Sequence, residues 1–404
     1  MTVPSADVAR YIDLHLLQTI PFANLNRDDT NSVKTVQYGG VNRTRISSQS
    51  WKRAIRRDVE QALGDEALRT RRIAERLERY LVEERGWPRP AAARAGIHTV
   101  VASSVGAQPP KQRKGADEAS GEDEVPWGTN AMVYVPASAI AELADIAEEH
   151  RSTLETAKDV KELKSKDALM PRDRVDAVLR SRNGIINLLG RMLAELDDAK
   201  VDGAAQVAHI MTTHQTDVEV DYFSAVDDIT AAWGDTAGSA HMGHAEYSAG
   251  TFYRYVTLDL RDLLRNLGGD RIAARRLASA FLTATVLSLP QAKKNSTAPH
   301  TVPDLITVQV RRDRPYSYAA AFERPVRFGA DGGYTHASIT TLDAYAGDLI
   351  TLLGASREPL RQAYTGIGAK DLSNLGPRVD SIDHLVETAL DVAFAVAAEA
   401  EGQA

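Results

Sequence analysis

The sequence predicts an α+β protein in which a ferredoxin-like sheet is divided by a helix-rich insertion. Strand-type alternation at Tyr11–Ile20 is followed by a helical pattern from about Gln49 to Leu63. A second series, of the type strand–helix–strand, occupies Thr251–Leu260, Arg271–Leu287 and Leu305–Arg311. Together the two series can make a βαββαβ sheet. The residues between them then form the insertion.

The first strand is indicated by a period of two. Ile12, Leu14 and Leu16 fall on one face of it, and Asp13 and His15 fall on the other. A polar loop and a glycine turn follow. The serine hydroxyls just ahead of the next helical pattern can cap that helix.

The predicted insertion is mainly helical. Helical patterns cover Leu68–Arg85, Ala139–Arg151, Thr153–Leu169 and Arg172–Leu196. Ala107–Pro126 instead lacks apolar periodicity and is rich in Pro, Gly and charged residues, which indicates a mobile loop.

Composition narrows the class of protein. The chain has 404 residues, of which 43% are hydrophobic and 25% charged, as in folded soluble proteins. It has no cysteine, which excludes a disulfide scaffold, a thiolate zinc site and a cysteine nucleophile. Met1–Arg10 does not resemble a secretory signal, and no apolar run approaches the ~20 residues of a membrane span. We therefore expect a cytoplasmic protein without membrane contact.

Charge is distributed unevenly along the chain. The net charge is −7, yet the segment from residue 27 to residue 57 carries a net charge of +6. Its basic residues are Arg27, Lys34, Arg43, Arg45, Lys52, Arg53, Arg56 and Arg57, and its acidic residues are Asp28 and Asp29. Such asymmetry predicts one basic groove on an otherwise acidic body, as in nucleic-acid-binding proteins.

The helix in this segment has features of a phosphate-binding element. Ser47 and Ser48 stand at its start, where free backbone N–H groups attract anions. Gln49 and Lys52 lie one turn apart near that end. Like charges four residues apart, as in Lys52 and Arg56, repel each other unless an anion lies between them. The alternative is a basic face that contacts only solvent.

A second basic cluster comprises Lys158, Lys161, Lys164 and Lys166. At helical spacing these lysines form a stripe that can follow a nucleic-acid backbone. The alternative is a charged, solvent-exposed helix face with Asp159 and Glu162 interleaved.

Catalytic and metal-binding patterns are weak. The closely spaced histidine pairs do not form an HExxH motif, and no phosphate-binding GxxxxGK loop or GxSxG elbow occurs. We expect no metal site, cofactor or catalytic residue. Asp28 and Asp29 could hold a metal for nuclease chemistry, although a loop or salt-bridge role is favoured. Tyr222 and Phe223 are adjacent aromatics that pack in a core or wedge between bases, and the sequence favours the core.

Several motifs resemble one known family. They are LNRDD (25–29), GG (39–40), RISSQSWKRAIR (45–56), GRM (190–192), VDGAAQVAHIMTTHQTDVEVDYFSAVDD (201–228), GSAHMG (238–243) and GTFYRY (250–255). In this order they resemble the CasC-type backbone subunit of the type I-E CRISPR Cascade complex, a member of the RAMP superfamily. The last third of the chain matches more loosely.

The resemblance implies a hand-like protein that binds CRISPR RNA, other Cascade subunits and further copies of itself, and that presents the RNA to a target DNA strand. It implies an RRM-like palm at residues 1–63 and 246–404, helical fingers at 64–192 and a protruding thumb hairpin at 193–245. The residues implied to hold the RNA backbone are Arg27, Lys34, Arg45, Ser48, Gln49, Lys52, Arg53 and Arg56.

The resemblance also implies residues outside the palm. Met192, Tyr222 and Phe223 match wedge positions at a kink in the RNA, and Tyr222 replaces the Trp of the family. The four lysines at 158–166 correspond to a finger that contacts target DNA. Two other functions stay open: a metal-dependent RNA-cleaving subunit, as in type III relatives, and a structural scaffold without nucleic acid.

Overall fold

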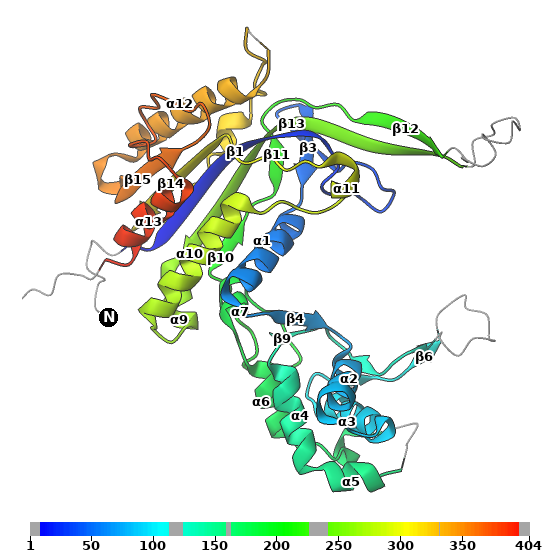
Figure 1. The fold of residues 1–404 in the computed structure, drawn as a ribbon. Coiled ribbons are helices and arrows are strands. Elements are labelled where there is room, and N and C mark those ends of the chain that lie inside the picture. Colours follow the sequence, from blue (N-terminus) through cyan, green and yellow to red (C-terminus); the bar gives the residue numbers. More distant parts are fainter. Residues whose placement is uncertain (1–8, 113–123, 159–162, 226–240, 331, 396–404) are drawn as a thin grey trace, which may run out of the picture. The chain divides into compact units, whose positions relative to one another are not determined.

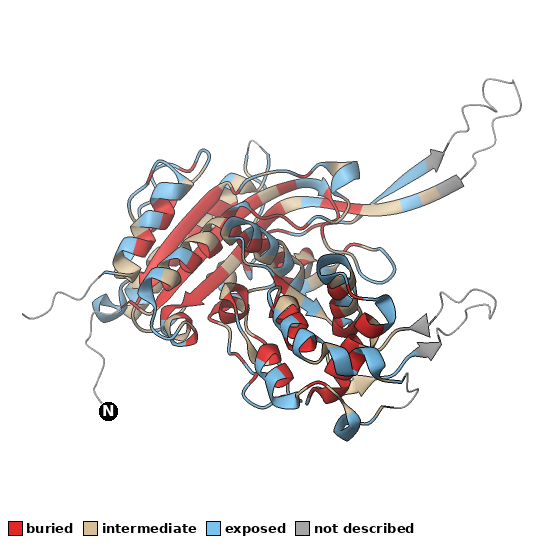
Figure 2. Cartoon of the chain, turned by 60° about the horizontal axis from the view of Figure 1, so that its bottom comes forward, coloured by how far each residue is buried: buried red, intermediate tan, exposed pale blue. Residues whose placement is uncertain are grey.

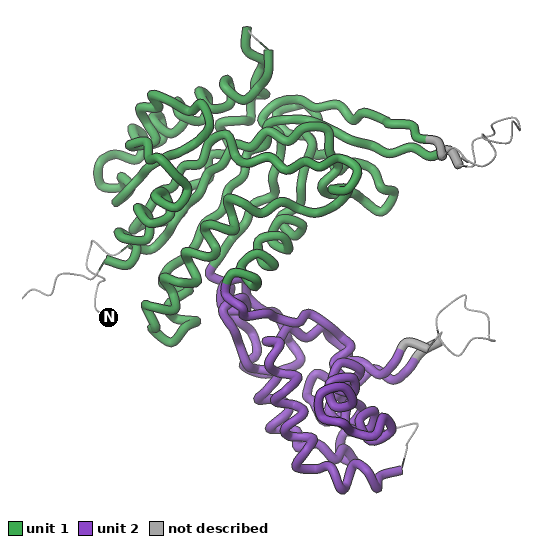
Figure 3. Tube along the Cα trace, viewed as in Figure 1, with its two compact units in different colours: residues 1–62, 205–404 green, residues 63–204 purple. Residues whose placement is uncertain are grey.

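The computed structural model describes residues 9–112, 124–158, 163–225, 241–330 and 332–395. Two compact units are present. The first combines Met1–Ala62 with Ala205–Ala404, and the second is Leu63–Ala204 (Figure 3). The α+β prediction is confirmed, because an antiparallel sheet in the first unit is combined with helices in both units.

The first unit is built on one antiparallel sheet with the strand order β15-β14-β1-β13-β11-β3-β2, and β10 and β12 also pair with β13. The strands are β1 (Tyr11–Ala23), β2 (Thr35–Tyr38), β3 (Val41–Ile46), β10 (Ala205–Val207), β11 (Ile210–Thr212), β12 (Glu219–Ala225), β13 (His241–Asp259), β14 (Leu305–Arg311) and β15 (Arg361–Thr365). β1 lies in the middle, with Tyr11 opposite both Asp259 on β13 and Arg311 on β14.

Helices cover both faces of this sheet (Figure 1). On one side lie α1 (Ser48–Leu63), α9 (Leu260–Asn266), α10 (Arg271–Leu287) and α13 (Ile382–Ala393). On the other side lie α12 (Thr335–Leu353) and the short helix η2 (Ala319–Phe322). Both faces of β1 are therefore buried, including Asp13 and His15 on the polar face (Figure 2).

A buried arginine fixes α1 to the sheet. Arg254 of β13 lies with its guanidinium carbon 4.0 Å from the ring centre of Trp51 on α1. It donates hydrogen bonds to Gln18 Oε1 at 2.7 Å and to the carbonyl of Thr285 on α10. Full burial lowers its pKa to about 9. Trp51, Ile55 and the rest of the apolar stripe thus face the sheet, and the basic residues of α1 point away from it.

A long hairpin extends from the sheet. β12 pairs with the first part of β13 from Glu219 opposite Tyr247 to Ala225 opposite His241. The remainder of β13 continues into the sheet beside β1. The two strands leave the sheet as a long ribbon (Figure 1).

The second unit is mainly helical and has its own apolar core. Its helices are α2 (Ile73–Arg85), α3 (Arg89–Ala102), α4 (Ala139–Glu149), α5 (Arg151–Thr156), α6 (Arg172–Arg180) and α7 (Gly184–Leu189). Short strand pairs join β4 (Ala67–Thr70) to β9 (Val133–Pro136), β5 (Ala107–Gln108) to β8 (Gly128–Thr129) and β6 (Lys111–Gln112) to β7 (Glu124–Val125). The ends of the predicted mobile loop thus pair, and its middle lies outside the described residues.

Three predicted helices are shorter than expected. Residues 67–70 pair with β9, so the helix predicted to start at Leu68 starts at Ile73. α5 ends at Thr156, and after it Lys164 is in an extended conformation. The helix predicted at Arg172–Leu196 is divided into α6 and α7, and α7 ends before Gly190, whose φ of 82° favours glycine.

Candidate nucleic-acid interface

The start of α1 is held by the residue that precedes it and by side chains from two other segments. Ser47 Oγ accepts a hydrogen bond from the Ser50 amide at 3.3 Å, as a helix cap does. Asn26 Oδ1 accepts from the Ser47 amide at 2.8 Å, which ties the loop after β1 to the helix. His209, which lies between β10 and β11, accepts a hydrogen bond from the Ser48 amide at Nδ1, at 3.2 Å.

His209 also contacts a cationic side chain at this end of the helix. Arg45 Nη1 lies 3.2 Å from His209 Nδ1. Burial first, and then the charges of Arg45 and Lys52, lower the pKa of His209. The neutral ring can accept hydrogen bonds at Nδ1, and it brings Arg45 and the helix start together. This role could not be predicted from sequence patterns, since His209 lies 164 positions from Arg45.

The other predicted backbone contacts lie around the same helix end. The carbonyl of Lys34, just before β2, accepts a hydrogen bond from the amide of Arg45 on β3 at 2.8 Å, so the two residues are neighbours. On α1, Gln49 and Arg53 are exposed and Lys52 is half-buried. These residues therefore share one surface of the first unit.

Three predicted contacts are already engaged within the chain. Arg56 Nη1 lies 3.2 Å from Glu60 Oε1, one helical turn away. Arg27 Nη1 donates to Asn31 Oδ1 at 2.9 Å. Ser48 is only 8% exposed, and its backbone amide already donates to His209 Nδ1.

Not every basic residue of the segment serves the surface. Arg43 is fully buried and donates hydrogen bonds of 2.9 Å to the carbonyls of Thr212 and Phe322. It stabilises the sheet edge against the segment after β14. The surface charge is accordingly smaller than the +6 of the sequence segment.

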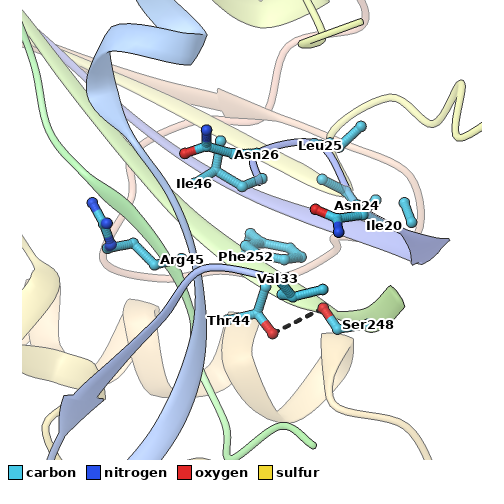
Figure 4. Close-up of a pocket in the computed structure, with 11 residues that line it drawn as sticks. Ile20, Asn24, Leu25, Asn26, Val33, Thr44, Arg45, Ile46, Ser248 and Phe252 are labelled. Atoms are coloured by element: carbon cyan, nitrogen blue, oxygen red, sulfur yellow. Dashed lines mark hydrogen bonds between the residues drawn. The ribbon is translucent and has the colours of Figure 1, made fainter. Parts of the chain in front are cut away.

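A small cavity lies behind the helix start (Figure 4). It measures about 10 Å³, which is room for one water at most. Thr44 Oγ1 donates to Ser248 Oγ at 2.8 Å in its wall, and Asn24 Nδ2 donates to the Glu246 carbonyl at 2.9 Å. The cavity cannot hold a nucleotide, so ligands of this region bind on the surface.

The aromatic pair on the hairpin is exposed. Tyr222 is 76% and Phe223 48% exposed, so their interpretation as core residues is wrong. The Phe223 ring covers Gly243 on the paired strand, where a Cβ would come within 2.5 Å of Phe223 Cζ. Sequence reasoning favoured a core because aromatic pairs usually pack inside, whereas a projecting ribbon has no core to enter.

Met192 is presented by a rigid backbone. It is 87% exposed, while the preceding Arg191 is only 4% exposed. Arg191 donates hydrogen bonds to five backbone carbonyls, those of Tyr134, Leu179, Arg180, Ser181 and Ala199. Burial lowers the pKa of Arg191 to about 10, and it remains charged at neutral pH. These bonds fix the turn that displays Met192.

The predicted lysine stripe is not helical. Lys158, Lys164 and Lys166 are exposed, but they follow the end of α5 or belong to the short helix η1 (Ser165–Asp167). Lys161 lies outside the described residues. Leu163 packs against the core of the second unit in place of a helical turn. A charged rail at helical spacing is therefore excluded for the described lysines.

The adjacent acids after β1 form a loop structure. Asp28 Oδ1 accepts hydrogen bonds from the amides of Thr30 and Ser32 at 2.9 Å and from the Thr30 hydroxyl at 2.7 Å. The hydroxyl and the two amides lower the pKa of Asp28. Asp29 is exposed. Within the described ranges, no group of three or more His, Asp or Glu side chains could hold a metal ion.

Comparisons with known proteins agree with the sequence motifs. The model of the family described as CT1975-like protein matches residues 12–388. A chain in a solved structure described as "CRISPR RNA-guided surveillance complex, pre-nicking" is 41% identical, with a TM-score of 0.83. The match covers 95% of this chain and 100% of that one. A second, described as "CRISPR RNA-guided surveillance complex", is 37% identical with a TM-score of 0.73, and the match covers 94% and 99% of the two chains.

A comparison with curated proteins gave no match. Among the described residues, no helix is both long and apolar enough to cross a bilayer. The resemblance to a subunit of CRISPR surveillance complexes is confirmed over almost the whole chain, while the type I-E assignment stays a prediction. Because the family model spans nearly all of the sequence, this chain belongs to the CT1975-like protein family.

Proposed function

We propose that this protein is a non-catalytic backbone subunit of a Cascade-type CRISPR surveillance complex, of type I-E, that oligomerises along the CRISPR RNA. The observation that carries the proposal is the cationic surface at the start of α1, which is formed by Arg45, Lys52 and Arg53. Arginine and lysine side chains bind phosphates, which carry no sequence information. The likeness to RNA-guided surveillance complexes supports RNA as the ligand.

The sheet would serve as an RRM-like palm. β1 lies between β13 and β14, and β10 and β11 follow on the far side of β13. This order is expected if β1, α1, β10 with β11, β13, α10 and β14 form the βαββαβ unit. We propose the palm at residues 1–63 and 246–404, fingers at 64–192 and a thumb at 193–245, and the separate core of Leu63–Ala204 supports the fingers.

The exposed apolar residues would act on the RNA. Tyr222 and Phe223 on the hairpin, and Met192 on its fixed turn, can wedge against nucleobases because every base has a π face. The exposed finger lysines would attract the target DNA strand. Bases between the wedges would stay free to pair with that strand, so pairing and not the protein reads the sequence.

The cleaving alternative has less support. Asp28 is committed to hydrogen bonds within its own loop, which leaves Asp29 as the exposed acid there. Two-metal chemistry draws on more than two acids. A Mg²⁺- or Mn²⁺-dependent RNA cleavage assay decides: activity lost in Asp28→Ala or Asp29→Ala would establish the enzyme and overturn our proposal. We also propose a cytoplasmic location, where CRISPR RNA is made.

The test of the proposal is co-expression with and without a CRISPR RNA. With the RNA, the protein should elute as a large species whose absorbance ratio reports nucleic acid. Without it, the protein should elute as small species. A stable filament free of RNA would support the structural scaffold instead.

A further inference from the structure

An aromatic cluster lies on the sheet face opposite α1 and α10. His15 of β1 stands opposite Tyr255 of β13, and Tyr253 lies two residues along on the same strand. The ring of His15 is 5.1 Å from that of Tyr255 and 6.2 Å from that of Tyr253, with planes within 28°. In RRM sheets, aromatics on the face opposite the helices stack two or three bases.

Here the chain itself covers these rings. The Tyr318 ring lies 3.9 Å from His15, with an angle of 16° between the planes, as a stacked base would. The amide of Tyr318 donates to the Tyr253 hydroxyl at 2.8 Å, and that hydroxyl lies 2.8 Å from His15 Nδ1. His15 and Tyr318 are fully buried and Tyr253 is 3% exposed.

The covering segment, Tyr316–Phe322, is anchored at both ends. The Tyr316 amide donates to Asp13 Oδ2 at 3.1 Å. At the other end, the Phe322 carbonyl accepts from the buried Arg43 at 2.9 Å. Tyr345 of α12 packs against the edge of Tyr318, with ring centres 5.7 Å apart. The cover is thus a fixed part of the fold.

We infer that Tyr318 occupies the position of a stacked base and closes the sheet face to nucleobases, which makes it a specificity-determining residue for RNA binding. This rests on the proposed function. An open face would hold two or three bases by stacking and withdraw them from pairing. Closure leaves only backbone contacts, so that any guide sequence binds alike and its bases remain available.

The first test uses the full chain assembled with a guide RNA that contains 4-thiouridine at every uridine. After irradiation, crosslinked peptides are identified by mass spectrometry. With the crosslinks located to single residues, we expect them on α1 and on β12, and none at His15, Tyr253 or Tyr255. Crosslinks at those three residues with comparable yield would overturn the inference. Failure of the proposed function looks different, since no RNA would assemble at all.

The second test asks whether the space under the cover is a flat stacking slot or an ordinary apolar core. Tyr318→Ala opens a cavity against His15, while the control Phe322→Ala opens one against Tyr253, where the rings are tilted by 47°. Phenol or uracil should raise the melting temperature of Tyr318→Ala by several degrees, and cyclohexanol should not. Uracil should leave Phe322→Ala unchanged.

Equal rescue of Tyr318→Ala by cyclohexanol, or rescue of Phe322→Ala by uracil, would return the cluster to general packing and overturn the inference. If Tyr318→Ala does not fold, the crosslinking of the wild-type assembly decides alone. In the variant assembly, bases that stack on the opened face should crosslink at His15, Tyr253 or Tyr255, because every base offers a π face.

Discussion

Replacing Lys52 and Arg53 together by glutamine should change how RNA affinity depends on salt. Both side chains lie on the first turns of α1, and neither forms an ion pair with a carboxylate in the described part of the chain. Each phosphate contact on a single strand contributes about 0.7 to the slope of log K against log salt. The double variant should therefore lose about 1.4 from that slope, and bind ~25-fold more weakly near 0.1 M salt.

The assay is a fluorescence-anisotropy titration of labelled guide RNA at several salt concentrations. Arg276→Gln is the matched control, because Arg276 is an exposed arginine on α10, away from the start of α1. Its slope should equal that of the wild type. Arg56→Gln should lose less than one contact, since Glu60 already neutralises part of that charge. Weaker binding of the double variant with an unchanged slope would refute the phosphate contacts.

Three further predictions concern the hairpin, the sheet and the fingers. Phe223→Ala should lower the free energy of unfolding of the RNA-free subunit by no more than about 1.5 kcal/mol, because the ring is half exposed. Truncation of a core phenylalanine costs ~3–5 kcal/mol. A loss of that size, measured by thermal unfolding, would show that Phe223 has a structural role. Burial raises the pKa of Asp13 to about 6, above its unfolded value, so this carboxyl stabilises the fold at low pH and loses that contribution as pH rises through 6. In the wild type the free energy of unfolding should fall by about 3 kcal/mol over this pH range. Denaturant unfolding of Asp13→Asn should show no such fall. Parallel pH profiles of the two proteins would contradict the prediction. The double variant Lys158→Glu, Lys164→Glu should assemble on RNA normally but capture target DNA more slowly at low salt. The difference in rate should shrink as the salt concentration rises. Loss of RNA assembly would contradict the proposed contact of these lysines with target DNA.

The long elements of the sheet were predictable because their signal is local. The helix predicted at Arg271–Leu287 and the strand at Leu305–Arg311 have those bounds in the structure. β10 and β11 have three residues each, which is too short for the two-residue alternation of a strand to be recognised in the sequence. They form because β13 offers a free edge, and sequence periodicity does not contain that information.

The charged residues of the candidate site could be predicted from the sequence, but their arrangement in space could not. The basic run around α1 is visible in the sequence, whereas Arg43 enters the core and His209 joins the site from a distant segment. The lysines at 158–166 have helical spacing in the sequence, yet α5 ends at Thr156 and the partly buried Leu163 packs against the core of the second unit. Exposure of Tyr222 depends on a hairpin that leaves the sheet, which is a property of the tertiary fold.

The central claim is that the protein holds RNA by its backbone, and the most direct measurement compares guides of one length and unrelated sequence. Affinities are measured on the full chain at one fixed salt concentration. Backbone recognition predicts values that agree within about threefold, because phosphates are the same in every guide. Base readout would separate them by roughly tenfold or more, since each recognised base is worth ~1–3 kcal/mol, and that result would contradict the account.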